Sequence, residues 1–305
     1  MLAVTGANGH LGLRLLREQV RLLREQAGHG VRALVRSADA ADQVRALGFG
    51  DAVDVRIVDY GSANDLAEAL GGCTAVVHLV GIIKESRASR YRNAHEGTCT
   101  AIAEAAHRAG LGRIVYLSIL GASVGSGNAC LASKGAAERI LRDGAIPVTV
   151  IRLPMVLGEG DFASRALSER ARRGRNLVLR GSSLEQPIYA GDVAAAVLVA
   201  ATESGTVEAY DLAGPESLTR TALIHRAAGL LGRRTRVLSL PLAVGLSMAR
   251  VLEHVSADPP VTRAMLGVLD HDDRIDPAPA AAALRLTLTP LDETLRRCIG
   301  GATAS

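Results

Sequence analysis

A glycine triplet near the N-terminus constrains the fold of this chain more than any other feature. Gly6, Gly9 and Gly12 directly follow the apolar run at residues 2–5 and open a helical pattern. In such a unit the first glycine permits a tight turn, the second lets the backbone approach a pyrophosphate, and the third allows close helix packing. The helix N-terminus adds unpaired amides and a partial positive charge. The spacing predicts a dinucleotide-binding turn formed by Gly6, Asn8, Gly9, His10, Leu11 and Gly12.

Short apolar runs alternate with helical patterns through the first half of the chain. The predicted strands are residues 2–5, 31–36, 53–59, 75–80, 113–118 and 148–153, and the predicted helices are residues 9–26, 40–47, 63–70, 91–109 and 129–142. Glycines at 28, 48, 71, 110 and 144 are expected to end these helices. This alternation is typical of βαβ units, so we expect an α/β fold with a Rossmann-type, doubly wound parallel sheet.

The second half of the chain is less regular and contains eight of the ten prolines. We therefore predict a dinucleotide-binding domain at residues 1–157 and a smaller, mixed α/β cap at residues 158–305, intimately joined, with part of the cap region able to return to the first domain. Ligands of doubly wound sheets bind beyond the carboxyl ends of the strands, where such a cap would close. Asp192 is expected to cap a helix running through Ala201. The scattered polar candidates of the cap are Glu159, Asp161, Arg180 and Gln186.

Composition excludes several classes of protein. The 305 residues are 48% hydrophobic and 22% charged, as in ordinary globular chains, which argues against disorder. Aromatic residues are only 2% with no Trp, so we predict no nucleic-acid partner despite the net charge of +4. The longest apolar runs are too short to span a membrane. The four Cys show no paired spacing, so we predict reduced thiols and a cytoplasmic location. The eight His show no ligand spacing, so we predict no metal site.

The end of the second predicted strand bears on cofactor choice. NAD-selective sites usually place an acid there to hold the ribose 2′-hydroxyl, but this chain has Arg36 followed by Ser37. A guanidinium pairs with a 2′-phosphate, so NADP(H) is favoured over NAD(H). The alternative is a solvated arginine in a chain with 33 Arg and two Lys. Further residues expected along the cofactor crevice are Asp59, Tyr60, Leu79, Val80, Gly81, Leu153 and Pro154.

Several motifs together carry a family resemblance. The glycine turn, Ser118 at the end of the fifth predicted strand, Lys134 in the following helix and Arg152–Pro154 resemble the extended or atypical branch of the short-chain dehydrogenase/reductase superfamily. Within it, the chain is similar to the subgroup of the NADPH-binding 39-kDa accessory subunit of respiratory complex I. The segments that carry this second resemblance are His78–Ile83, His95–Thr98, Tyr189–Val193 and Leu212–Glu216.

The resemblance implies roles for three residues. In the superfamily a Tyr four residues before the Lys transfers the proton, the Lys holds the nicotinamide ribose, and a Ser orients the substrate. Here Cys130 stands in the Tyr position, four residues before Lys134. A thiol is acidic enough to donate, but its sulfur lies roughly 3 to 4 Å closer to the backbone than a phenolic oxygen. Cys130 is therefore either a proton donor acting through a water or shifted substrate, or a small residue where catalysis has been lost. Ser118 either orients the substrate or forms a hydrogen bond with a backbone group at the end of the strand.

Two functions follow from these observations. The favoured one is an NADP(H)-dependent atypical oxidoreductase or epimerase-like enzyme acting on a small-molecule carbonyl, quinone-like or sugar-like substrate, with Ser118, Cys130 and Lys134 at the reacting face. The alternative is a non-catalytic NADPH-binding protein with an assembly, structural or redox-sensing role. Either function is compatible with an oligomer.

Overall fold

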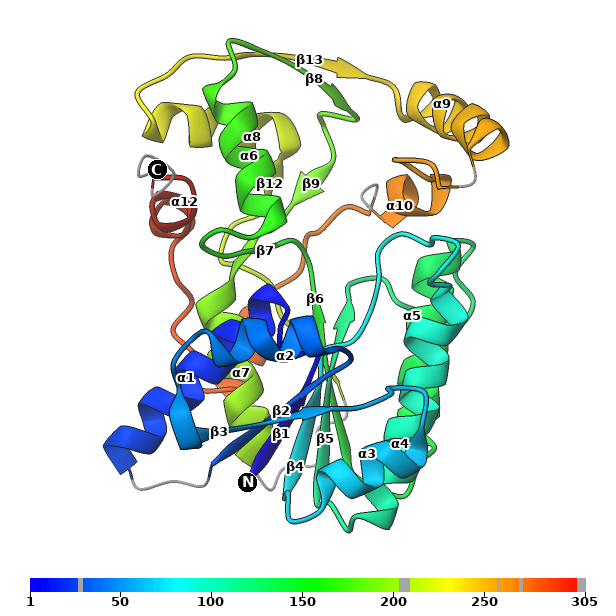
Figure 1. Cartoon of the computed structure of the whole chain (residues 1–305). Coiled ribbons are helices and arrows are strands. Elements are labelled where there is room, and N and C mark those ends of the chain that lie inside the picture. The colour runs from blue at the N-terminus through cyan, green and yellow to red at the C-terminus, as the bar shows by residue number, and fades with distance from the viewer. Residues whose placement is uncertain (27–29, 203–208, 257, 269–270, 301–305) are drawn as a thin grey trace.

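The computed structural model describes residues 1–26, 30–202, 209–256, 258–268 and 271–300. At its centre lies a parallel seven-stranded sheet in the order β11-β6-β5-β4-β1-β2-β3 (Figure 1). The strands are β1 (Leu2–Thr5), β2 (Val31–Val35), β3 (Val53–Ile57), β4 (Ala75–His78), β5 (Arg113–Ile119), β6 (Val148–Leu153) and β11 (Ala209–Asp211). All six predicted strands are present, and the predicted doubly wound fold is confirmed.

Helices cover both faces of the sheet, which is why the central strands β1 and β4 are apolar and buried almost throughout. One face packs against α1 (His10–Gln26), α2 (Ala38–Arg45), α7 (Ala190–Thr202) and α11 (Ala278–Ala283). The other packs against α3 (Ala63–Leu70), α4 (Thr98–Arg108) and α5 (Ala129–Arg142). The predicted helix at residues 91–109 begins with a π-helical turn, η2 (Arg92–Gly97). The predicted helix end at Gly28 lies outside the described residues.

The carboxyl ends of the strands point toward a second layer of structure, the cap (Figure 1). Its core is shared by α6 (Phe162–Arg172), α8 (Arg220–Leu230) and α12 (Leu291–Gly300). Its other elements are β7 (Val156–Leu157), β8 (Arg175–Leu179), β9 (Leu184–Glu185), β10 (Ile188–Tyr189), β12 (Leu218–Thr219), β13 (Arg236–Leu240), α9 (Leu242–Val255) and α10 (Arg263–Val268). Between cap elements the chain returns to the sheet to add α7 and β11.

The expectation that Asp192 caps α7 is wrong. The helix begins at Ala190, so Asp192 lies inside its first turn. Its carboxylate accepts hydrogen bonds from the amide and the hydroxyl of Thr289, at 2.7 and 2.8 Å. Asp192 therefore ties α7 to the segment that precedes α12.

Candidate cofactor and active site

The glycine turn is tightly folded at the carboxyl end of β1. Gly6 has a φ of +66°, and the amide of Gly9 donates to its carbonyl at 3.0 Å. A Cβ at Gly12 would lie only 2.6 Å from the Gly6 oxygen, so no side chain fits there. Gly9 and His10 are exposed at the start of α1. The result is a cradle of backbone amides at a helix N-terminus, the arrangement that a pyrophosphate requires.

Tyr60 holds this turn against the sheet. Its hydroxyl accepts from the Gly6 amide at 2.8 Å and donates to the Leu34 carbonyl at 2.7 Å. Burial raises the pKa of Tyr60 to about 12, so the phenol stays neutral. The neighbouring Asp59 accepts from the Gly61 amide at 2.8 Å. Both residues were predicted along the cofactor crevice, and the contacts observed shape its backbone.

Arg36 and Ser37 lie at the carboxyl end of β2, and both are exposed. Ser37 caps α2, because its hydroxyl accepts from the Ala40 amide at 3.2 Å. Arg36 has no hydrogen bond or ion pair with any described residue, and its charge opposes the rise in the Tyr60 pKa. Its guanidinium is thus close to the glycine turn and available to a ligand.

The remaining predicted crevice residues flank the turn and the end of β6. Leu79 packs beside Gly6, where a Cβ would lie 3.5 Å from it, and its amide donates to Thr5 Oγ1 at 3.3 Å. Asn8 reaches Gln43 on α2 at 3.3 Å, and Leu11 is half-buried. Val80 and Pro154 are half-buried, whereas Leu153 is buried and accepts from the Leu120 amide through its carbonyl.

Lys134 points into the interior from α5. Its ammonium donates to the Tyr116 hydroxyl and to the Leu117 carbonyl, both at 3.0 Å. Burial lowers the pKa of Lys134, while Cys99, Cys130 and Glu138 act in the opposite direction. Gly81 makes room for it, since a Cβ there would lie 3.0 Å from Nζ. An ammonium has three donors, so one remains for a ligand.

Cys130 is buried in the first turn of α5. Asn128 caps that helix by accepting from the amides of Cys130 and Leu131, at 2.9 and 3.2 Å. The thiol points to the Ile82 carbonyl, 3.8 Å from Sγ. Burial raises the thiol pKa, and the nearby Lys134 charge lowers it less. Cys130 is therefore a protonated thiol at neutral pH.

Two aromatic side chains near Cys130 were not predicted as site residues. Tyr91 contacts the thiol and donates to the Ile83 carbonyl at 2.6 Å. Its ring stacks on His95, with 5.6 Å between centroids. The Nε2 atom of His95 lies 3.1 Å from the Ile82 amide, and burial lowers the pKa of this imidazole to about 3. The only sequence signal for His95 was its place in the family motif His95–Thr98.

Ser118 and His95 each keep a buried polar atom without a partner. Neither Ser118 Oγ nor His95 Nδ1 has a hydrogen bond to any described residue, although both side chains are buried. They belong to the same edge of the sheet: Ser118 is the last residue but one of β5, and His95 contacts the loop after β4. Unpartnered buried groups are rare in folded proteins, and a ligand would satisfy them. The glycine cradle and these two atoms together fit a dinucleotide and a polar substrate atom.

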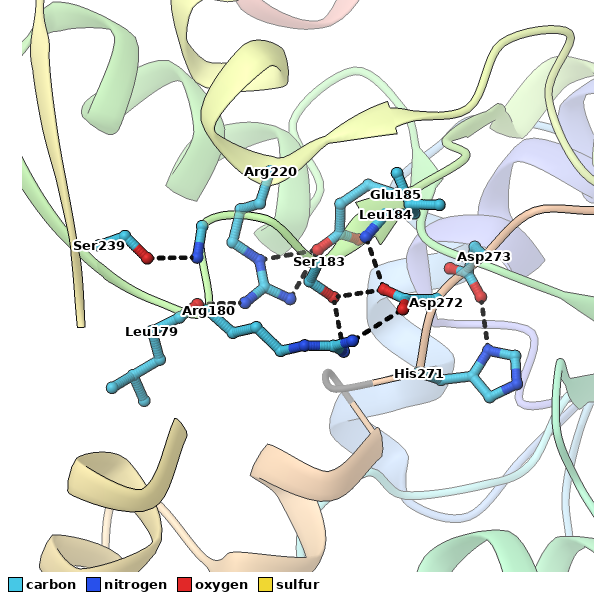
Figure 2. A network of polar contacts seen from close by, with 11 residues as sticks. Leu179, Arg180, Ser183, Leu184, Glu185, Arg220, Ser239, His271, Asp272 and Asp273 are labelled. Atoms are coloured by element: carbon cyan, nitrogen blue, oxygen red, sulfur yellow. Dashed lines mark hydrogen bonds and ion pairs between the residues drawn. The ribbon is translucent and has the colours of Figure 1, made fainter. Parts of the chain in front are cut away.

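The polar candidates of the cap serve mainly to hold it together. Arg180 pairs with Asp272 at 2.7 Å, and Asp272 also accepts from the Leu184 amide (Figure 2). In the same network the buried Glu185 pairs with Arg220 at 2.7 Å, and the imidazole of His271 lies 3.1 Å from Asp273. The other three candidates make structural contacts too: Glu159 with Arg14 and Tyr189, Asp161 as the cap of α6, and Gln186 with Gly214 and Ile275.

Three further properties of the described residues bear on the kind of protein this is. No described helix is both long and apolar enough to cross a membrane. Within the same residues no cluster of three or more His, Cys, Asp or Glu could hold a metal ion. All four cysteines are free and buried.

Comparison with known proteins agrees with this geometry. The model of a family described as NAD(P)H-binding matches residues 6–204. A ceramide reductase of Caulobacter vibrioides is 31% identical over 245 residues, which are 79% of this chain and 74% of that protein. The mitochondrial NADH dehydrogenase [ubiquinone] 1 alpha subcomplex subunit 9 of Arabidopsis thaliana is 27% identical over 81% of this chain, which spans only 61% of that subunit's length.

A solved structure shares the whole fold. The NADPH-dependent quinone oxidoreductase of Escherichia coli, complexed with NADPH, superposes with a TM-score of 0.73 at 22% identity, covering 97% of this chain and 98% of that one. Fold and site thus define a Rossmann-type protein that binds a nicotinamide dinucleotide. The chain belongs to the NAD(P)H-binding family. The predicted similarity to the complex I subunit is confirmed by the Arabidopsis relative.

Proposed function

We propose that this protein is an NADP(H)-dependent reductase of an apolar carbonyl or quinone-like compound. One observation carries the proposal: the glycine cradle, the spare donor of Lys134 and the unpartnered hydroxyl of Ser118 all lie along one edge of one sheet. Such an edge presents a cofactor and a substrate oxygen to each other. The free guanidinium of Arg36 supports the phosphorylated cofactor.

The substrate class rests on the lining of the crevice and on the relatives. Leu79, Val80 and Ile82 are half-buried apolar residues in the loop after β4, beside Lys134 and Cys130. The named activities of the Caulobacter relative and of the Escherichia coli structure are reductions of a lipid and of a quinone. We therefore favour these classes over a sugar-like substrate, and we keep the cytoplasm as the predicted location.

Each residue has a task in this proposal. The turn amides bind the pyrophosphate, Arg36 binds the 2′-phosphate, and Lys134 donates its third hydrogen to a ribose hydroxyl. A bound NADPH would supply the hydride that reduces the substrate. Ser118 donates to the substrate oxygen and orients it. Cys130 holds a proton at neutral pH, and a water between its thiol and the substrate would carry that proton across the gap left by the missing phenol.

The burial of Cys130 favours one alternative, a non-catalytic NADPH-binding protein. Its thiol is almost inaccessible to solvent and donates a hydrogen bond to the Ile82 carbonyl, as expected of a cysteine with a structural role. The similarity to a subunit of a respiratory complex supports an assembly role.

Titration with NADPH, followed by NADPH oxidation with long-chain ketones, quinones and nucleotide-linked ketosugars, separates these functions. We expect turnover with the apolar substrates. Ser118→Ala should lower kcat/KM about 10-fold or more, as for other oriented donors, without changing the Kd for NADPH. The control Cys73→Ser changes a buried residue with no role in the proposed site, so it should leave kcat/KM and the Kd for NADPH unchanged. Tight NADPH binding without turnover on any substrate would establish the alternative.

A further inference from the structure

The outer side of α9 carries an uncovered apolar stripe. Val244, Met248, Val251 and Val255 recur at intervals of four, three and four residues, which places them on one side of a helix. Their exposed fractions lie between 48% and 75%. The opposite side of α9 packs inward through Gly245 and Ala249, which are buried. A helix in this position would ordinarily show polar residues to water, so the stripe calls for a partner.

The neighbouring β8–β13 ribbon also carries exposed apolar residues. These parallel strands pair Leu177 with Leu238, and both leucines are exposed, at 59% and 63%. Helix α9 rests against the same ribbon, because a Cβ at Gly245 would lie 2.3 Å from Leu179. The ribbon and α9 together form the end of the cap farthest from the sheet (Figure 1). We call the four α9 residues and the two leucines the apolar end face.

Unpaired positive charge accompanies the apolar end face. Four exposed arginines on or next to these elements, Arg175, Arg234, Arg236 and Arg250, make no ion pair with any described residue. Arg175 and Arg236 are themselves paired in the ribbon register, two positions before the two leucines. The only acid in β8, β13 or α9 is Glu253, which is paired with Arg263 at 2.8 Å. The surface is therefore both apolar and cationic.

We infer that the apolar end face docks on the surface of a bilayer that contains anionic lipid. Apolar side chains enter the boundary of headgroups and acyl chains, while arginines pair with the phosphates, which is the composition of helices that lie in a membrane interface. A symmetric contact with a second copy would bring the same unpaired arginines face to face, so charge favours a lipid surface over self-association.

The docked orientation places the crevice near the membrane. Helix α10 packs on both α9 and α5. Asn128, the cap of α5, donates to the Ala264 carbonyl of α10 at 2.8 Å, and Lys84 pairs with Asp258 at 2.8 Å. A docked molecule therefore holds α5, the helix of Cys130, one helix away from the lipid. This last step rests on the proposed function, whereas the docking itself does not.

Vesicle flotation with the full chain tests the inference. The probes are vesicles of phosphatidylcholine alone and of phosphatidylcholine mixed with phosphatidylglycerol. We expect binding to the mixed vesicles only, weakened by high salt. The double variant Val251→Glu/Val255→Glu should bind at least about ten-fold more weakly, because each change removes apolar contact and adds repulsion. Arg234→Ala/Arg236→Ala should reduce the preference for anionic lipid.

Phe162→Glu is the matched control. Phe162 is 75% exposed, like Val255, but begins α6 at the end remote from β8, about 15 Å along the helix. The Phe162→Glu variant should bind vesicles as the unaltered chain does. An NADPH titration that matches that of the unaltered chain would show that each variant is folded. Absence of vesicle binding, or equal binding by the double glutamate variant, would overturn the inference. A dimer that the glutamates dissociate would instead assign the face to a second copy.

Discussion

The ammonium of Lys134 and the phenol of Tyr116 lie 3.0 Å apart inside the sheet edge that forms the candidate site. Burial raises the pKa of Tyr116 well above its ordinary value, so its hydroxyl is a neutral acceptor. Together with the Leu117 carbonyl it directs two of the three donors of Lys134 inward. Strand β5 thus orients the Lys134 side chain, and only one N–H donor of its ammonium is left to bind a ligand.

Lys134→Met tests whether that donor binds cofactor. Methionine has a similar length, and removing a buried charge relieves its desolvation cost, so the unfolding free energy should change little. The affinity for NADPH should fall about ten-fold or more, the worth of a hydrogen bond from a charged group. Denaturant melts and a binding titration measure the two effects. Lys84→Met, at a lysine paired with Asp258, is the control; an unchanged affinity in Lys134→Met would make Lys134 purely structural.

Arg36→Ala should change the choice of cofactor rather than the fold. We expect the Kd for NADPH to rise about 10- to 100-fold, while the weaker binding of NADH stays the same, because only NADPH carries the 2′-phosphate. Parallel titrations with both cofactors measure this. Arg17→Ala removes another exposed arginine, from α1, and should have no effect. Equal loss of both cofactors would point to damage at the adjacent turn instead.

The fold could be predicted because its signal is local. Residues 2–5, 63–70, 129–142 and 148–153 have the bounds predicted from periodicity and turn residues. The glycine turn is local in the same sense. The partners of Lys134 are not: Tyr116 precedes it by 18 positions and resembles any apolar strand residue. The π-helical turn at Arg92–Gly97, which carries His95, has the periodicity of an ordinary helix and was not predicted.

The cap resisted prediction for a different physical reason. Four of its strands, β7, β9, β10 and β12, are only two residues long, too short for an alternating pattern. The polar network of Figure 2 joins β9 to the start of α8, directly after β12, because Glu185 pairs with Arg220 across 35 positions. Ion pairs between distant segments leave no periodic trace in a sequence.

Acid should destabilise the fold through two buried histidines. Burial lowers the pKa of both His78 and His95 from the ordinary 6.5 to about 3. Between these values the unfolded chain binds more protons, so the unfolding free energy falls as pH falls, by about 1.4 kcal/mol per pH unit for each histidine. The two buried neutral histidines make their full contribution to the unfolding free energy above pH 6.5. Denaturant melts from about pH 7 to about pH 5 measure the slope.

His78→Gln isolates one of these contributions. The imidazole lies 2.8 Å from Thr5 Oγ1 and 3.2 Å from Thr98 Oγ1, and an amide can keep one of these bonds. The variant should be less stable at neutral pH but should lose about half of the histidine slope. The raised pKa of Glu185 and of Asp273 acts in the opposite direction, so the difference between the two chains is the readout. An identical slope would show that His78 titrates normally.

Alanine at two of the turn glycines should separate folding from cofactor binding. At Gly12 the new Cβ would lie 2.6 and 2.7 Å from the carbonyl oxygens of Gly6 and Ala7, and backbone cannot move aside cheaply, so we expect about 1 to 3 kcal/mol of destabilisation. At Gly9 the nearest atom is 3.3 Å away and the site is exposed. Gly9→Ala should therefore keep its Tm yet lose NADPH binding, because the methyl group would occupy the path of the pyrophosphate. Calorimetry and titration on both variants check this, and retained binding in Gly9→Ala would move the cofactor away from the turn.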